Sequence, residues 1–97
     1  MSGSIYKCYT GRPTEAWYAL TPEQQQQKFA QIDEARKAAG GKTLIICNSS
    51  WASDHTLFFG VEEFPDIDSV QQFHAALMKL DWFRYVDGET VLGTKWE

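Results

Sequence analysis

Residues 66–86 read DIDSVQQFHAALMKLDWFRYV, and this stretch determines how the rest of the chain is interpreted. It predicts one amphipathic helix followed by an aromatic tail, because apolar residues return every three or four positions. A short oxygen-bearing side chain, Asp68 or Ser69, can cap the first turn. A helix with one apolar face needs a surface to cover. The apolar positions are Val70, Phe73, Leu77 and Leu80.

A second helix is predicted upstream, from Pro22 to about Ala39. Thr21 fits the N-cap, Pro22 the first helical position and Gln24 the third, which together make a capping-box pattern. The pair Gly40-Gly41 is typical of a helix end. The expected buried stripe of this helix is Phe29, Ile32, Ala35 and Ala39.

Four short stretches rich in β-branched and aromatic residues predict strands. They are Ile5–Thr10, Thr43–Ser49, His55–Glu63 and Glu89–Trp96, the last preceded by a turn at Asp87-Gly88. The order is therefore βαββαβ. This order is typical of an α+β, ferredoxin-like fold, in which a four-stranded antiparallel sheet carries two helices on one face. We expect residues 1–97 to form a single such domain.

The second face of the predicted sheet also needs a cover. Leu44–Cys47 is apolar on both faces, which indicates a strand that is shielded on both sides. Two helices on one side leave the other side bare, and an identical sheet is the simplest cover for it. We therefore expect a homodimer through the sheet face.

Composition argues against several classes of partner. The net charge is −4 and the nine basic residues are scattered, so the concentrated positive field that nucleic acid needs is missing. The longest clean apolar run, Leu44–Cys47, is far too short to cross a bilayer, and the first residues lack the apolar region of a secretory signal. We expect a cytoplasmic protein without nucleic-acid or membrane partners. Cys8 and Cys47 show no metal-ligand spacing, so we expect no bound metal.

The chain resembles a known superfamily in two places. The succession Ser69-Val70, His74, Leu77-Met78, Leu80, Phe83, Tyr85 and Asp87 resembles the second-helix region of muconolactone isomerase-like proteins, which belong to the dimeric α+β barrel superfamily. The connector 16–23, AWYALTPE, is similar to that of uncharacterised small families of the same superfamily. The superfamily also holds cofactor-free antibiotic-biosynthesis monooxygenases and small polyketide cyclases. The resemblance implies a dimeric α+β barrel.

The same resemblance implies the chemistry. It favours a small cofactor-independent enzyme of the isomerase, cyclase or monooxygenase type, acting by proton transfer on a hydrophobic aromatic, polyketide-like or lactone molecule. Haem-degrading members of the superfamily use an asparagine on the first strand, and Ile5–Thr10 contains none, so we expect no cofactor. The alternative is a non-catalytic module that binds a small hydrophobic ligand or mediates oligomerisation.

His74 is the first candidate for the catalytic residue, because imidazole titrates near neutral pH. Tyr6 or Tyr85 would polarise a substrate carbonyl. The alternative for His74 is a structural histidine at the edge of the core, and buried tyrosines commonly have a structural partner.

Pockets of this fold lie between the sheet and the helices and are mostly apolar. The aromatic side chains of connectors, turns and helix ends are therefore the candidates for substrate contact, although each also fits an ordinary core or interface. The substrate-binding candidates are Cys8, Trp17, Trp51, Phe58, Trp82 and Phe83.

Overall fold

The structure, a computed structural model, describes residues 3–96. The predicted order of elements is confirmed, with a short helix α1 before α2 and a 3-10 turn η1 after α3. The elements are β1 (Ile5–Pro13), α1 (Glu15–Tyr18), α2 (Pro22–Ala38), β2 (Lys42–Asn48), β3 (Phe58–Phe64), α3 (Ile67–Lys79), η1 (Trp82–Arg84) and β4 (Val86–Thr94).

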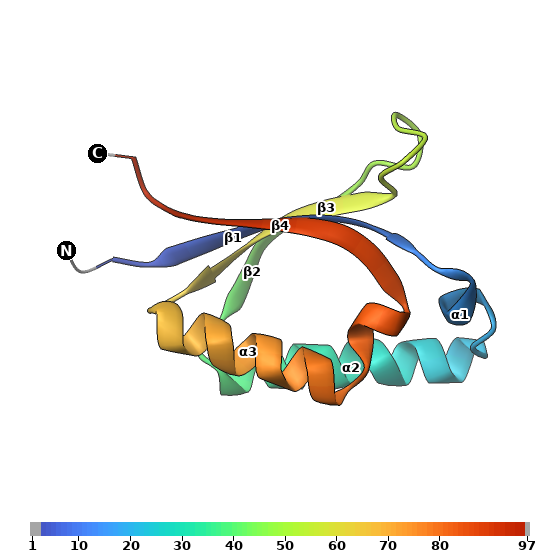
Figure 1. Cartoon of the computed structure of the whole chain (residues 1–97), viewed down its shortest axis with the longest axis horizontal. Coiled ribbons are helices and arrows are strands. Elements are labelled where there is room, and N and C mark those ends of the chain that lie inside the picture. The colour runs from blue at the N-terminus through green and yellow to red at the C-terminus, as the bar shows by residue number, and fades with distance from the viewer. Residues whose placement is uncertain (1–2, 97) are drawn as a thin grey trace.

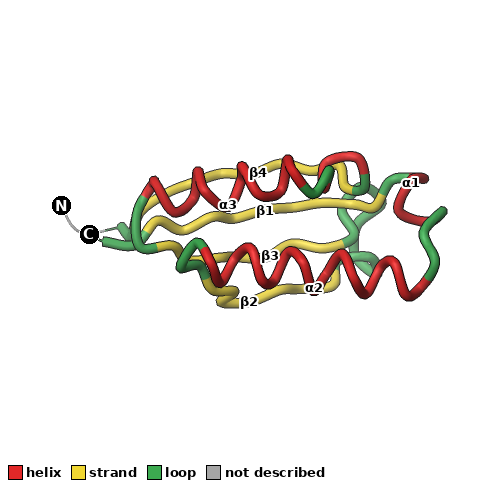
Figure 2. Tube along the Cα trace, turned by 90° about the horizontal axis from the view of Figure 1, so that it is seen from below, coloured by secondary structure: helices red, strands yellow, loops and turns green. Residues whose placement is uncertain are grey.

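The four strands form one antiparallel sheet in the order β2-β3-β1-β4. Both long helices lie on the same side of this sheet (Figure 1). Seen from the helix side, α3 runs along β4 and β1, while α2 runs along β3 and β2 (Figure 2). The ferredoxin-like α+β fold expected from the sequence is therefore present.

The start of α2 is the capping box that the sequence predicts. Thr21 Oγ1 accepts a hydrogen bond from the Gln24 backbone N–H at 3.1 Å, and Gln24 Oε1 accepts one from the Thr21 N–H at 2.9 Å. Two otherwise orphaned donors of the first turn are thereby satisfied. Phe29 is a correction, because its side chain is 55% exposed instead of buried in the stripe.

The cap of α3 differs from the prediction. Asp66, and not Asp68 or Ser69, is the N-cap, and its Oδ1 accepts a hydrogen bond from the Ser69 backbone N–H at 2.8 Å. The helix therefore starts two residues earlier than an Asp68 cap would allow. Asp68 instead lies in the first turn, where its negative charge complements the positive end of the helix dipole.

Two strand boundaries were wrong in the sequence prediction. Asp87 and Gly88 do not form a turn, because β1 continues to Pro13 and its last residues pair with the start of β4. The β4 backbone packs so closely against Thr10 at Gly88 that a Cβ atom would have no room. Strand β3 begins at Phe58, so residues 55–57 belong to the connection after β2.

The core lies between the sheet and the two long helices. Phe64 of β3 and Phe73 of α3 are almost fully buried, with ring centroids 5.5 Å apart. Ile32 of α2 completes the contact between the layers. The α3 stripe predicted from the sequence is buried as expected at Val70, Phe73 and Leu77.

The sheet face turned away from the helices is apolar and open in the single chain. Its exposed side chains include Ile45 at 54%, Phe59 at 38% and Val91 at 64% exposure. In a single chain Leu44, Ile45 and Ile46 are exposed, and the cover that we expect for the open face is an identical sheet. Among the described residues, the helices are too short or too polar to span a membrane.

Candidate functional site

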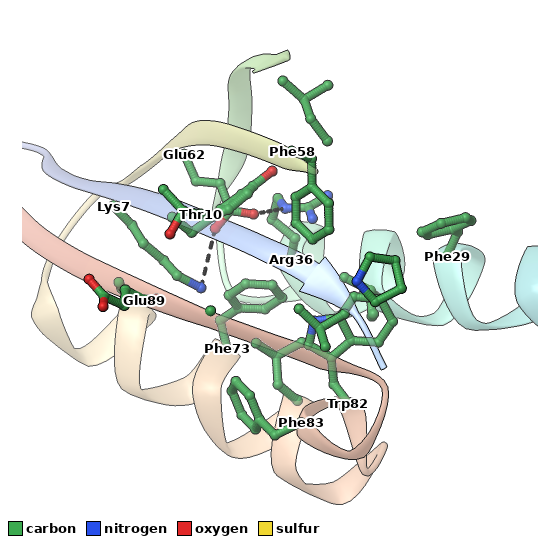
Figure 3. Close-up of a pocket in the computed structure, with 18 of the residues that line it drawn as sticks. Lys7, Thr10, Phe29, Arg36, Phe58, Glu62, Phe73, Trp82, Phe83 and Glu89 are labelled. Carbon is green, nitrogen blue, oxygen red and sulfur yellow. Dashed lines mark hydrogen bonds and ion pairs between the residues drawn. The ribbon is translucent and has the colours of Figure 1, made fainter. Parts of the chain in front are cut away.

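A cavity of about 350 Å³ lies between the sheet and the helices. Figure 3 shows that side chains from the sheet and from both long helices converge on it. Most of its wall is apolar, and a small group of charged side chains lies at one end. The apolar wall includes Trp17, Ile32, Ile46, Phe58, Phe73, Leu77, Trp82, Phe83 and Val86.

A buried carboxylate is the centre of the charged end. Glu62 of β3 is 2% exposed, and its Oε2 accepts a hydrogen bond from Arg36 Nε of α2 at 2.6 Å. Lys7 of β1 is 5% exposed, and its Nζ lies 3.4 Å from Glu62 Oε1. Both interactions are drawn in Figure 3. One carboxylate thus meets two cations in the protein interior.

The strand register explains this meeting. Lys7 pairs directly with Glu62 across β1 and β3, so both side chains point to the same face. Residues directly opposite each other in antiparallel strands have Cβ atoms about 4.5–5.5 Å apart, within reach of an ion pair. Arg36 lies in the last turns of α2 and reaches the same carboxylate.

One acceptor of this group is left open. Glu62 Oε1 is buried and accepts no hydrogen bond within residues 3–96, and the Lys7 amine lies 3.4 Å from it as an ion-pair partner. A buried carboxylate oxygen that accepts no hydrogen bond is unfavourable. A donor on a bound molecule would satisfy this oxygen.

The apolar surroundings change the titration of the site. Burial lowers the pKa of Lys7, although the nearby charge of Glu62 opposes the effect. Burial also raises the pKa of Tyr9, whose neighbour Glu62 acts in the same direction. The Lys7 Nζ lies 4.9 Å from the Phe73 ring centroid, so the face of this ring covers the amine.

The other end of the cavity is aromatic. The Trp17 ring centroid lies 5.1 Å from that of Phe29 and 5.7 Å from that of Trp82. The Trp82 ring meets Trp17 edge-on, a favoured arrangement of aromatic rings. A flat apolar group would find several aromatic rings at this end of the cavity.

The structure brings four of the predicted binding residues together. Trp17, Phe58, Trp82 and Phe83 all line the cavity. Trp51 does not, because its side chain is 83% exposed in the connection between β2 and β3, where its indole N–H donates to the Asn48 carbonyl. Cys8 lies on the open face of the sheet, opposite Val61 and Val91.

The three predicted catalytic residues lie outside the cavity wall. His74 is half-buried on α3 and stacks on Phe83, with ring centroids 6.2 Å apart. Tyr6 is on the open face, where its hydroxyl donates to Glu63 Oε2 at 3.3 Å. The Tyr85 ring packs against Trp17, with centroids 6.2 Å apart. The structure does not bring these three side chains together.

Sequence reasoning missed the charged end of the site. Lys7, Arg36 and Glu62 were not selected, although Lys7 alternates with Ile5 and Tyr9 on one face of the first strand. The available signal was an opposite charge on the matching face of the third strand, at Glu62. Within residues 3–96, no group of three or more histidine, cysteine or acidic side chains is arranged to hold a metal.

The comparisons with known proteins give a family and a fold. The model of a family of unknown function, DUF6616, matches residues 6–96, so the chain belongs to this family. No curated protein matches the sequence.

Several solved structures share the fold. Chlorite dismutase from Candidatus Nitrospira defluvii in complex with imidazole has a TM-score of 0.76 and 17% identity, with 99% of this chain and 41% of that chain covered. A mutant of the same enzyme in complex with cyanide gives a TM-score of 0.75 at the same identity and coverage. The de novo designed protein Ferredog-Diesel has a TM-score of 0.54 and 17% identity, with 97% of this chain and 88% of that chain covered. The chain therefore spans about two fifths of the length of these dismutases.

Proposed function

For this member of the DUF6616 family, we propose binding of a small, largely apolar ring compound and a cofactor-independent proton transfer on it. The observation that carries the proposal is the cavity in which an apolar wall meets a buried carboxylate, one oxygen of which accepts no hydrogen bond within residues 3–96 and has only the Lys7 ion pair beside it. Pockets that combine a mostly apolar wall with a few convergent polar groups are the usual sites of small-molecule binding.

The two ends of the cavity have different roles in this proposal. The rings of Trp17, Phe58 and Trp82 hold the apolar part of the ligand. Glu62 Oε1 then accepts a proton or a hydrogen bond from the polar group of the ligand. Arg36 holds the carboxylate in place through the other oxygen, Oε2. A base held in place by a second hydrogen bond is the usual arrangement for proton transfer.

The proposed reaction remains of the isomerase, cyclase or monooxygenase type that the resemblance to muconolactone isomerase-like proteins implies. In this proposal His74 supports the cavity through Phe83, on which its ring stacks, and Glu62 moves the proton. Tyr9, whose raised pKa keeps the phenol protonated, lines the cavity and replaces Tyr6 and Tyr85 as the phenol that polarises the carbonyl in this proposal.

The second part of the proposal is the homodimer. The open sheet face carries Ile45, Phe59 and Val91, all at least 38% exposed in one chain. Neighbouring exposed apolar side chains of this kind mark an interface, and an identical face is self-complementary under a two-fold axis. Sedimentation at micromolar concentration is expected to give the mass of two chains, and the mass of one chain would contradict the dimer.

The binding is tested with 2-tetralone, an apolar ring ketone with exchangeable protons beside its carbonyl. The four tryptophan indole N–H signals of an NMR spectrum serve as reporters. Trp17 and Trp82 line the cavity, whereas Trp51 and Trp96 are exposed. We expect the signals of the first two to shift on titration. Equal shifts of all four, or no shifts, would contradict binding in the cavity.

Catalysis is tested with the same compound in heavy water. Wild-type protein is expected to accelerate deuterium uptake beside the carbonyl, and Glu62→Gln is expected to lose most of this acceleration, about 10²-fold or more for a general base. Glu63→Gln, on the other face of the sheet, is the matched control. Binding without accelerated uptake would favour the non-catalytic binding module instead.

A further inference from the structure

Lys7 has a special position in the cavity. It is the only lysine in the cavity wall, within the described part of the chain, and its side chain is almost fully buried. Its Nζ lies 3.4 Å from Glu62 Oε1, 4.9 Å from the Phe73 ring centroid and 5.8 Å from the Tyr9 ring centroid. A molecule in the cavity would therefore meet the amine next to a proton acceptor.

The surroundings favour the neutral form of this amine more than solvent does. Burial is the largest effect on the Lys7 pKa and lowers it, and the positive charge of Arg36 acts in the same direction. The carboxylate of Glu62 opposes this, but it also binds Arg36, at the shorter distance of 2.6 Å. The other titratable neighbours are Tyr9 of β1 and, through its electrostatic interaction with Lys7, His74 of α3.

We propose that Lys7 captures the carbonyl group of an apolar aldehyde or ketone as an imine. This inference rests on the proposed function, because the cavity must first bind the ring of the same molecule. A lysine made nucleophilic by desolvation in an apolar pocket is a known route to covalent catalysis.

The step is balanced without a cofactor or a redox partner. Glu62 Oε1 takes a proton from the Lys7 ammonium, and the Nζ lone pair forms a bond to the carbonyl carbon while the carbonyl electron pair moves to oxygen. That oxygen takes a proton from the attacking nitrogen, which has become positively charged, and the result is a neutral carbinolamine. Glu62 returns its proton to the hydroxyl, which leaves as water while the C=N bond forms. The products are one protonated imine, one water and the Glu62 carboxylate, so protons and charge balance.

Capture by imine formation also defines the substrate class. A carbonyl carbon that reaches Lys7 Nζ places the rest of the molecule along the apolar wall toward Trp17 and Trp82. Ring ketones and aromatic aldehydes meet both requirements. Alcohols of the same shape meet only the apolar one, so they bind without covalent attachment.

The experiment uses 2-tetralone with sodium cyanoborohydride at neutral pH, which reduces a protonated imine to a stable amine and leaves the free ketone intact. Intact mass is expected to show one adduct per chain, and peptide mapping is expected to place it on Lys7. Most of the trapped adduct should be on Lys7, and the yield at each exposed lysine should be several times lower, because the cavity holds the ketone beside this amine. The alcohol 2-tetralol should give no adduct.

Two variants sharpen the assignment. Lys7→Arg keeps a cation beside Glu62 but has no amine that forms imines, and it should abolish the adduct. Lys42→Arg is the matched control, because Lys42 also pairs with a strand carboxylate, Glu63, but is exposed. Mapping of the wild-type adduct decides the question even if Lys7→Arg folds poorly.

The outcomes separate this inference from the proposed function. Adducts spread over exposed lysines, or an adduct that persists in Lys7→Arg, would overturn the inference. Shifted Trp17 and Trp82 signals without any trapped adduct would overturn the imine and leave the binding proposal standing. Absence of both the shifts and the adduct would overturn both.

Discussion

Each face of the sheet carries some side chains that are unusual for their surroundings. The helix side buries Lys7 and Glu62, whereas the open side exposes Ile45 and Val91. Alternate residues of the same strands supply both faces, since Lys7 and Cys8 are neighbours in β1 and Glu62 and Val61 are neighbours in β3. Buried charges cost free energy and exposed apolar patches lower solubility. Both features are explained if the helix side, the inner face, is a binding site and the open side, the outer face, is an interface between two chains.

The largest expected effect tests the outer face. Val91→Lys places an ammonium group within the proposed dimer interface, where it would lose its hydration without gaining a partner. We expect complete loss of the dimer at micromolar concentration, seen as a twofold lower mass in sedimentation. Lys95→Ala near the end of the chain is the control and should keep the mass of two chains. A Val91→Lys protein that stays dimeric would place the interface elsewhere.

The next effect tests the inner face. Glu62→Gln leaves Lys7 and Arg36 without their shared negative charge in the protein interior. Breaking a buried ion pair by removing one partner costs about 3–5 kcal/mol, and we expect a loss of this size in the free energy of unfolding. Urea denaturation followed by circular dichroism measures it.

The neighbouring residue provides the control for this loss. Glu63 lies one position along β3 and points to the open side, where it pairs with the exposed Lys42. Glu63→Gln should therefore change the stability far less. Equal losses of unfolding free energy in Glu62→Gln and Glu63→Gln would mean that burial does not increase the contribution of the Glu62 ion pairs to stability.

The fold was predictable because it rests on local patterns. The capping box at Thr21 marks where α2 begins. The α3 stripe marks the face that this helix buries, at Val70, Phe73 and Leu77. The order of strands and helices then leaves few topologies. Strand ends were less predictable, since Gly88 looks like a turn residue and only the approach of the Thr10 backbone explains its place in a strand.

The site was only half predictable. Aromatic residues at element ends pointed to the cavity, and Trp17, Trp82 and Phe83 line it. The charged end depends on which alternate residues of a strand face the helices, and the sequence does not state this. Lys7 and Glu62 become neighbours only through the register of β1 and β3, which are 55 positions apart at this pair. Pairings over such distances leave no local pattern.

A smaller effect tests how tightly the inner face is packed. Gly60 lies under Tyr9, and an added Cβ would be 2.5 Å from the Tyr9 hydroxyl oxygen. Gly60→Ala should lower the free energy of unfolding by about 1–3 kcal/mol, the usual cost of overpacking. Gly93 in β4 has no heavy atom within 4 Å of its would-be Cβ. Gly93→Ala should therefore be neutral or gain up to about 1 kcal/mol, as expected for alanine in place of a strand glycine.

The smallest effect concerns the pH dependence of stability and comes from His74, which stacks on Phe83 of the cavity wall. Burial lowers the pKa of His74 below its ordinary value of 6.5, and the charge of Lys7 adds to this while Glu62 opposes it. Between the lowered value and 6.5 the unfolded chain binds more protons than the folded chain, so stability rises with pH across this window and falls on acidification through it. His74→Gln should flatten this dependence in urea titrations at pH 5 to 7, whereas His55→Gln, in the exposed connection after β2, should preserve it. An unchanged slope of unfolding free energy against pH in His74→Gln would show that the acid sensitivity does not come from His74. The two faces of the sheet would then differ in packing and charge but not in the pH dependence of their stability.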